Sequence, residues 1–397
     1  MVITRFQLSR LPRIEFGAGV LSRLASIVAQ SGSRVLLVTG HHSLQRTDAW
    51  LRITEAFRQA ALQWQHLSVA GEPSPALVDE AVRTYRPASI DVVVGIGGGS
   101  ALDAAKAIAG LLRPGNSVMD HLEGVGPELP YRGPATPFIA VPTTAGTGSE
   151  TTKNAVLSVQ GPAGFKKSFR DEQLVATCAL IDPDLLATCP PGVIAANGMD
   201  AFTQLLESYV SSRAAPLTDS LAWGGMKAAR DGLLALYADA GNAAARERMA
   251  YAAMISGITL AQVGLGSVHG LAAPLGAFFP IPHGVACGTL VATATRVNID
   301  ALRARTPEHP ALDKYAQVGR MLARSGDLAQ DDAHTALIDT LFDWTRTLRL
   351  PTLDHYGVQT DDLPRIVANS RGSSMKTNPV VLEDTEIAAI VSARLSS

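Results

Sequence analysis

Short, continuous apolar runs alternate with stretches of helical spacing along the first half of the chain. The strand candidates share branched apolar residues and lie at 34–39, 91–96, 137–141, 154–159 and 179–181. Helix-like stretches follow the first two runs, one reaching Phe57 and one starting near Ala101. Apolar runs between helices are typical of parallel strands that are covered on both faces. The pattern therefore predicts an α/β fold with a parallel sheet for this half.

The second half shows no comparable strand signal. After Pro190 and Pro191, helical segments rich in alanine and leucine run to the end of the chain. Expected breaks between helices lie at 241, 280–282, 307–310 and 351, where glycine or proline interrupts the pattern. We therefore predict an α/β domain at 1–185 and an all-helical domain at 186–397, with the ligand site in the cleft between them.

Composition and charge exclude several classes of protein. The chain has 397 residues, of which 47% are hydrophobic and 18% are charged, as expected of an ordinary globular protein. Lys and Arg (34) nearly balance Asp and Glu (36), so neither a nucleic acid nor an anionic membrane is an expected partner. The cysteines, Cys178, Cys189 and Cys287, form no CxxC pair, and no apolar segment follows the first arginines. These features predict a cytoplasmic protein without a secretory signal.

The stretch from Met249 to Thr295 contains no Asp, Glu, Lys or Arg. Prolines, glycines and Gln262 interrupt it, so a buried helical core is expected in place of a membrane span. Two histidines, His269 and His283, lie inside this uncharged segment.

A glycine-rich turn follows the apolar run at 91–96. Gly97, Gly98, Gly99 and Ser100 lie between that run and a helix that carries Asp103 and Lys106. Glycines allow close approach of a pyrophosphate, and the helix N-terminus favours its charge. The turn departs from the Rossmann fingerprint because Ser100 occupies the third glycine position. A tight strand-to-helix turn without a ligand is the alternative interpretation.

A second polar loop, Pro-Thr-Thr-Ala-Gly-Thr-Gly-Ser-Glu, spans 142–150 and also follows a predicted strand. Its hydroxyl groups, which include Thr143, Thr144 and Thr147, could bind phosphate or ribose oxygens. Such residues are also common in loops that bind nothing.

Four further residues have the chemistry of a metal site. Asp200 and Gln204 are four residues apart and share one face of a predicted helix. Together with His269 and His283 they could hold a divalent metal and leave a position open for substrate. A buried histidine is more often a core residue, but the charge of Asp200 would need a partner in an uncharged core.

These motifs, in this order over the whole chain, resemble the iron-containing (group III) alcohol dehydrogenase family. The shared segments are the glycine turn at 97–100, PTTAGTGSE at 142–150, GMDAFTQ at 198–204, His269 and IPHG at 281–284. The resemblance implies dehydroquinate-synthase-like architecture, with a dinucleotide-binding first domain and a metal- and substrate-binding helical domain. It also implies hydride transfer between a nicotinamide and an alcohol or aldehyde carbon, assisted by Fe²⁺ or Zn²⁺ as a Lewis acid. A homodimer or larger homo-oligomer is expected.

The resemblance also assigns site residues. The implied metal ligands are Asp200, Gln204, His269 and His283, and Asp200 and the two histidines act in catalysis through the metal. The implied positions for NADP or NAD are Gly97, Gly98, Gly99, Ser100, Asp103, Thr143, Thr144, Thr147 and Lys166.

The chain departs from the family at two positions of the metal site. Gln204 stands where the family usually has histidine, and an amide oxygen is a weaker ligand that could also serve as a supporting group. Ala273 replaces a second histidine, so water, a ribose hydroxyl or another group must carry the proton.

Two other departures concern the cofactor and the substrate. Gly40 stands where NAD-specific members of the family usually have Asp. Without that carboxylate a 2′-phosphate is not repelled, which favours NADP, and His41, His42 and Ser43 could bind the phosphate. In the alternative interpretation, Gly40 is an ordinary turn residue. Arg371 and Lys376 flank a Thr-Asn-Pro segment that lies near the family's active site. They suggest an acidic substrate, unless they are solvated loop cations.

The sequence therefore predicts an NAD(P)-dependent, metal-assisted oxidoreductase that interconverts a primary alcohol and an aldehyde, with an ω-hydroxy acid and its semialdehyde as one candidate pair. A metal-independent, maleylacetate-reductase-like enzyme acting on an acidic oxo compound is an alternative. A dehydroquinate-synthase-like lyase and a non-catalytic binding protein are the remaining alternatives.

Overall fold

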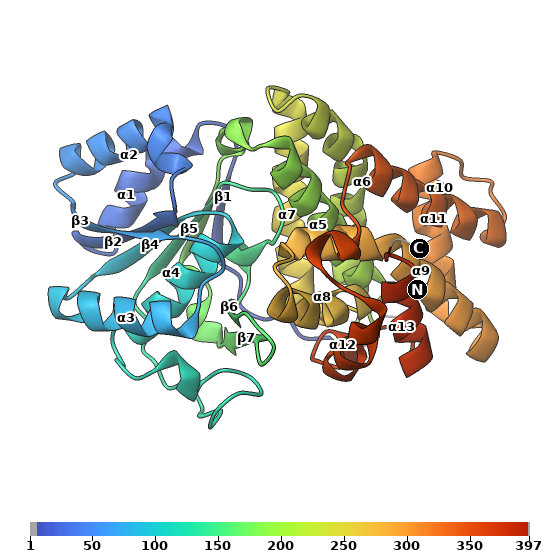
Figure 1. Ribbon diagram of the computed structural model, residues 1–397. Coiled ribbons are helices and arrows are strands. Elements are labelled where there is room, and N and C mark those ends of the chain that lie inside the picture. Colours follow the sequence, from blue (N-terminus) through green and yellow to red (C-terminus); the bar gives the residue numbers. More distant parts are fainter. Residues whose placement is uncertain (1–5, 396–397) are drawn as a thin grey trace.

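The computed structural model describes residues 6–395 and has two halves that lie side by side (Figure 1). The N-terminal half is built on a six-stranded parallel sheet with the order β1-β8-β5-β4-β2-β3. Its strands are β1 (Arg13–Phe16), β2 (Arg34–Gly40), β3 (Gln63–Val69), β4 (Val92–Gly97), β5 (Phe138–Pro142) and β8 (Cys178–Ile181). The predicted α/β class is confirmed.

Helices cover both faces of the sheet. Successive side chains of β2 enter opposite cores: Val35 and Leu37 pack with α1 (Leu24–Ala29) and α2 (Asp48–Gln59), whereas Leu36 and Val38 pack with α3 (Pro75–Tyr85) and α4 (Gly99–Leu111). This alternation follows from the two-residue period of a strand. The central strand β4 is buried at every position, which explains its continuous apolar sequence.

The structure differs from the predicted strands in three places. The run at 154–159 is a strand, β6 (Asn154–Val159), but it pairs antiparallel with β7 (Phe165–Arg170) in a separate hairpin. The edge strands β1 and β3 were not predicted. Both lie at the ends of the strand order, and β3 alternates polar with apolar residues because one side of it is exposed.

The C-terminal half is helical, as predicted. Its helices are α5 (Pro191–Val210), α6 (Pro216–Ala238), α7 (Ala243–Val263), α8 (Ser267–Phe278), α9 (His283–Arg305), α10 (Pro310–Ala323), α11 (Gln330–Thr347), α12 (Leu363–Asn369) and α13 (Asp384–Ser392). A break falls at each of the four predicted places, where the glycine or proline lies between two helices or, as Pro310 does, begins one. The breaks at 211–215, 264–266, 324–329 and 370–383 were not predicted. Helices α5 and α7 are nearest the sheet (Figure 1).

The uncharged segment at 249–295 forms most of α7, all of α8 and the first half of α9, and most of its residues are buried. Within residues 6–395, no single helix is long and apolar enough to cross a membrane; α7 and α8 meet that criterion only as a pair that is bent by 100°.

Candidate metal centre and cofactor site

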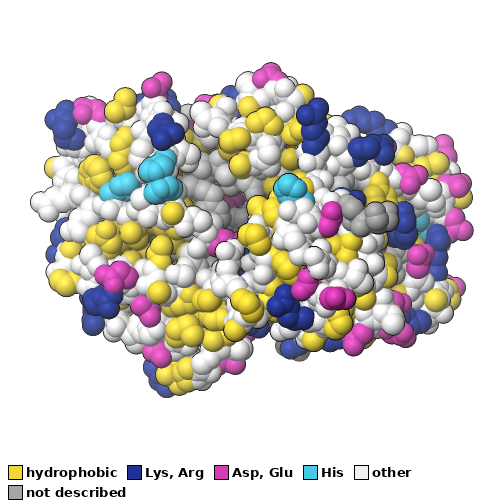
Figure 2. Space-filling view, in the orientation of Figure 1, with side chains coloured by type: hydrophobic (Ala, Val, Ile, Leu, Met, Phe, Trp, Pro, Cys, Tyr) yellow, Lys and Arg dark blue, Asp and Glu magenta, His cyan; other side chains and the backbone are white. Residues whose placement is uncertain are grey.

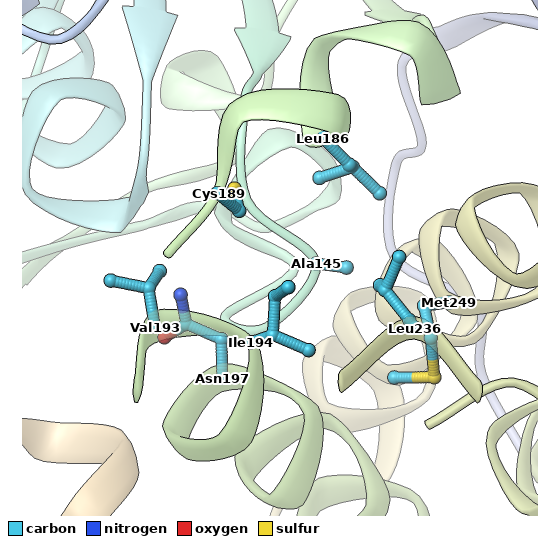
Figure 3. Close-up of a pocket in the computed structure, with 8 residues that line it drawn as sticks. All are labelled: Ala145, Leu186, Cys189, Val193, Ile194, Asn197, Leu236 and Met249. Carbon is cyan, nitrogen blue, oxygen red and sulfur yellow. The ribbon is translucent and has the colours of Figure 1, made fainter. Parts of the chain in front are cut away.

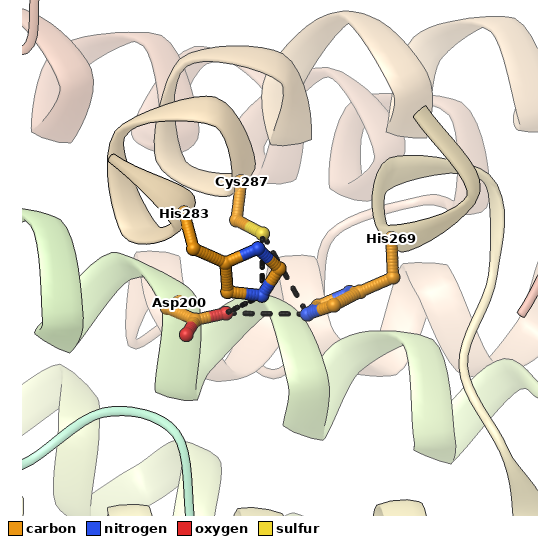
Figure 4. A group of neighbouring side chains, drawn as sticks. All are labelled: Asp200, His269, His283 and Cys287. Carbon is orange, nitrogen blue, oxygen red and sulfur yellow. Dashed lines mark hydrogen bonds and ion pairs between the residues drawn. The ribbon is translucent and has the colours of Figure 1, made fainter. Parts of the chain in front are cut away.

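Four potential metal ligands from three helices converge in the helical half (Figure 4). Asp200 lies on α5, His269 on α8, His283 begins α9, and Cys287 follows one turn later. The Asp200 Oδ1 lies 3.2 Å from His269 Nε2 and 4.0 Å from His283 Nε2. The Cys287 Sγ lies 3.6 Å from His269 Nε2 and 3.8 Å from His283 Nε2. One potential ligand atom from each residue lies within 4.8 Å of all the others.

The chemistry of this cluster fits a bound cation. Asp200 is fully buried, and its Oδ2 has no hydrogen-bond partner, as is also true of His283 Nδ1. A buried carboxylate without compensation is costly, so it calls for a positive charge. Burial, followed by the charge of Lys166, lowers the pKa of His283 to about 4, which keeps the imidazole neutral and able to bind a metal. Burial raises the pKa of the Cys287 thiol to about 12.

Hydrogen bonds from Glu207 and Gln204 orient two of these ligands, His269 and Asp200. The Glu207 Oε2 lies 2.6 Å from His269 Nδ1, and its Oε1 accepts from the backbone N–H of Val268 at 2.7 Å. Because a carboxylate accepts, His269 donates through Nδ1 and turns Nε2 toward Asp200. The Gln204 Nε2 donates to Asp200 Oδ1 at 3.3 Å. Asp200, Gln204 and Glu207 therefore use one face of α5.

The two loops predicted to bind the cofactor meet at the carboxyl ends of β4 and β5. The Thr143 N–H donates to the Gly97 carbonyl at 2.9 Å. A Cβ on Gly99 would lie 2.7 Å from Thr147 Cγ2, so only glycine fits at this contact. Helix α4 begins at Gly99 without a side-chain cap, which leaves its first N–H groups for an anionic ligand.

Gly40 lies at the carboxyl end of β2, beside β4. A Cβ on Gly97 would lie 3.3 Å from Gly40 N, so the two backbones approach closely. A Cβ on Gly40 itself would meet only Ser43 Oγ, at 3.9 Å. The Gln45 Nε2 donates to Thr39 Oγ1 at 2.8 Å and to the Gly40 carbonyl at 3.2 Å. Histidine side chains are exposed on both sides of the hollow between the two halves (Figure 2).

Two predicted cofactor residues lie in ion-pair networks. Lys166 on β7 pairs with Glu72, which also accepts a hydrogen bond from Ser158. Asp103 accepts from Ser149 Oγ at 2.6 Å and lies 3.8 Å from the Nζ of Lys106. Asp103 thus stabilises the base of the cofactor loops, and contact with the cofactor remains a prediction for both residues.

The predicted substrate cations lie outside the metal cluster. The Arg371 guanidinium binds the Asp384 carboxylate and donates to the Leu382 carbonyl at 3.0 Å. Lys376 is exposed. The neighbouring Asn378 has a clear role, because its Oδ1 accepts from the Ser267 N–H at 3.1 Å and so fixes the start of α8, two residues before His269.

Two hollows lie outside this cluster. A small pocket between the 142–150 loop and helices α5 to α7 is lined mainly by apolar side chains such as Val193, Leu236 and Met249 (Figure 3). A larger hollow of about 790 Å³ lies beside the end of β3 and the β6–β7 hairpin. It includes Glu72 and Ser158, so it borders the Lys166 ion pair.

Sequence reasoning missed Cys287 and Glu207. Cys287 is four residues after His283, and Glu207 is seven after Asp200, so helical spacing alone places each on the face of a predicted ligand. The same helical spacing that places Gln204 beside Asp200 extends to Glu207 on α5 and from His283 to Cys287 on α9.

A parallel sheet with a glycine loop at its carboxyl edge, beside a helical half with an Asp-His-His-Cys cluster, is the arrangement expected of a dehydrogenase that binds a dinucleotide and a divalent metal. Residues 12–183 match the family model for iron-containing alcohol dehydrogenases, and residues 194–395 match that for the C-terminal part of the same family. The chain belongs to the iron-containing alcohol dehydrogenase family.

Individual relatives support this assignment over the full length. The chain is 30% identical over 384 residues to alcohol dehydrogenase 4 of Saccharomyces cerevisiae, covering 95% of each chain. It is 30% identical over 358 residues to lactaldehyde reductase of Escherichia coli, covering 88% of this chain and 89% of the relative. A solved structure of an archaeal halo-thermophilic alcohol dehydrogenase from a Red Sea brine pool superposes with a TM-score of 0.91, at 26% identity and 100% coverage of both chains.

Proposed function

We propose that the protein interconverts a small primary alcohol and its aldehyde, using NADP or NAD and a divalent metal held in the Asp200 cluster. The observation that carries this proposal is the fully buried Asp200, whose Oδ1 lies 3.2 Å from His269 Nε2 and 4.0 Å from His283 Nε2 and whose Oδ2 has no hydrogen-bond partner. A metal held there would act as a Lewis acid on the substrate oxygen.

The protein side chains position the reaction. Glu207 fixes the tautomer of His269, and Asn378 fixes the start of the helix that carries it. The loops at 97–100 and 142–150 offer N–H and hydroxyl groups to the pyrophosphate and ribose. The charge of Lys166 acts on the metal cluster as well, since after burial it helps to lower the pKa of His283.

The region around Gly40 supports use of NADP as well as NAD. Gly40 carries no carboxylate to bind the two adenosine ribose hydroxyls or to repel a 2′-phosphate. His41, His42 and Ser43 follow directly and provide donors for such a phosphate. We propose a modest preference for NADPH and therefore aldehyde reduction as the working direction.

A neutral substrate is better supported than an ω-hydroxy acid. Arg371, the better candidate for gripping a carboxylate, is already bound to Asp384. The relatives named as a lactaldehyde reductase and a sulfoacetaldehyde reductase include one neutral and one anionic aldehyde in their names, so the proposal of a neutral substrate rests on Arg371.

The test is aldehyde-dependent oxidation of NADPH and NADH, with butanal, lactaldehyde and a carboxylate-bearing semialdehyde as substrates. We expect turnover of the two neutral aldehydes, and a loss of kcat of roughly 10²–10³-fold or more in Asp200→Asn. Efficient turnover of the semialdehyde alone would contradict the neutral-substrate proposal. Undiminished activity of Asp200→Asn would contradict metal assistance.

A further inference from the structure

The ligand set of the metal site differs from the one that the family resemblance implies. We propose that Cys287, and not Gln204, supplies the fourth protein ligand, which makes this a site with two imidazoles, one carboxylate and one thiolate. The substrate oxygen would then enter as a fifth ligand. The inference rests on the proposed metal-assisted function and specifies how this chain holds its metal.

The position of the Cys287 sulfur matches that of a ligand. Ordinary zinc–sulfur and zinc–nitrogen bonds at a tetrahedral angle place the two ligand atoms about 3.6 Å apart. The Cys287 Sγ lies 3.6 Å from His269 Nε2 and 3.8 Å from His283 Nε2. Cys287 and His283 are one helical turn apart on α9, so both side chains reach the same point (Figure 4).

Gln204, in contrast, presents a donor to the cluster. Its Oε1 accepts from Ser256 Oγ at 2.7 Å, and its Nε2 faces Asp200 Oδ1 at 3.3 Å. Since a carboxylate can only accept, the amide group next to Asp200 must be the NH₂, which has no lone pair for a metal. Gln204 therefore holds Asp200 in position and leaves the fourth ligand position to another residue.

The burial of the cluster independently favours a bound cation. Asp200 and Cys287 are both 0% exposed, and Asp200 Oδ2 has no hydrogen-bond partner. A divalent cation would neutralise these buried acidic groups, and Glu207, which bonds His269 Nδ1, adds a further negative charge beside the cluster.

The thiolate changes which metal the site prefers. Sulfur is a soft ligand that favours Zn²⁺, and Zn²⁺ already binds more tightly than Fe²⁺ at most sites of this kind. We therefore expect this chain to select zinc, although its family is named for iron.

The experiment is to load the full-length, metal-stripped protein with Co²⁺ and to record its absorption spectrum. Cobalt replaces zinc at tetrahedral sites, and a coordinated thiolate gives a strong charge-transfer band in the near ultraviolet that nitrogen and oxygen ligands do not give. We expect this band in the wild type at one Co²⁺ per chain, and its loss in Cys287→Ser. We also expect Cys287→Ser to bind Zn²⁺ at least about 10–100-fold more weakly, since loss of a mere supporting group has that effect.

Two control variants complete the design. Cys189→Ser removes a thiol that lies outside the cluster and bonds to the Thr143 carbonyl, so it should keep the band. Gln204→Ala should also keep it, because the amide is not a ligand.

Stoichiometric Co²⁺ binding without the band, or a band that survives Cys287→Ser, would overturn this proposal and leave the proposed function standing. Failure of the wild type to bind Co²⁺ or Zn²⁺ at all would overturn both.

Discussion

Glu207 shows how a single side chain prepares a metal ligand. Its carboxylate accepts from His269 Nδ1 at 2.6 Å and from the Val268 N–H at 2.7 Å, so both the ring and its backbone are held. Fixing Nδ1 as the donor leaves the Nε2 lone pair for the metal. The role of Glu207 is positional, since it touches His269 and not the other three members of the cluster.

Replacement of Glu207 by glutamine should therefore weaken metal binding while the protein stays folded. We expect an affinity loss of about 10–100-fold for Zn²⁺, as is typical when the partner of a ligating histidine is changed. Titration of the metal-stripped variant against a chelator of known affinity measures this, with circular dichroism as the control for folding. An unchanged affinity would show that Glu207 does not orient His269.

Gly40 allows a test of cofactor choice at one residue. A side chain fits there, because its Cβ would meet only Ser43 Oγ at 3.9 Å. Gly40→Asp should lower kcat/KM for NADPH and raise it for NADH, since a carboxylate repels the 2′-phosphate and accepts from the ribose hydroxyls. Gly40→Ala is the matched control and should change the NADPH to NADH ratio little. A similar shift in both variants would mean that bulk, and not charge, sets the preference.

Among the secondary-structure elements, the sequence predicts the strands that have apolar surroundings on both faces. Strands β2, β4 and β5 are covered on both faces and show continuous apolar runs, so their positions follow from composition. Strand β3 lies at the sheet edge and carries polar residues such as Gln63 and Gln65, so no apolar run marks it. The separate β6–β7 hairpin could not be predicted either, because pairing partners are set by tertiary contacts.

The sequence predicts part of the candidate site, as it does part of the fold. Asp200, His269 and His283 are recognisable by residue type and order, and the structure brings them together. Cys287 is recognisable by its spacing after His283, whereas the donor orientation of Gln204 depends on its hydrogen bond to Ser256 of α7, a contact that the α5 sequence alone does not show. The sequence does not show that Arg371 is already paired, because its ion-pair partner, Asp384, lies on another element. Arg371 is therefore easily taken for a substrate ligand.

The contact between α7 and the 142–150 loop gives a prediction at this scale. Gly257 packs so closely that a Cβ there would lie 2.1 Å from the Gly148 carbonyl oxygen. Gly257→Ala should therefore destabilise the protein by about 1–3 kcal/mol, because the backbone must move. Gly192→Ala is the control, because no other heavy atom lies within 4 Å of the Cβ that it would add. This substitution should leave the free energy of unfolding unchanged or raise it by up to about 1 kcal/mol. Urea midpoints measure both, and equal midpoints would contradict the packing argument.

At the scale of the whole molecule, buried charges lie where the two halves meet. Lys106 is fully buried and donates to the carbonyls of Ser149 and Asn154, each at 2.7 Å. Burial lowers its pKa to about 8, and burial raises the pKa of nearby Glu150 to about 7. These groups are ionised more readily in the unfolded chain, so they make stability depend on pH.

Glu150 should lower the stability of the fold as the pH rises from about 4.5 to about 7. In that window the unfolded chain releases the proton while the folded chain keeps it, so unfolding becomes more favourable by about 3 kcal/mol. Glu150→Gln removes this contribution. The variant should gain stability relative to the wild type between pH 4.5 and pH 7, as measured by urea midpoints at both values. A difference that does not vary with pH would contradict a raised pKa at Glu150.

A metal held by the Asp200 cluster is proposed to support hydride transfer. The most direct measurement is the metal content of the freshly purified protein, combined with NADPH- and NADH-dependent aldehyde reduction before and after chelation and after return of Zn²⁺ or Fe²⁺. We predict close to one metal per chain, activity that is lost with the metal, and recovery on its return, with Zn²⁺ the more effective. Full activity in metal-free protein would contradict the account.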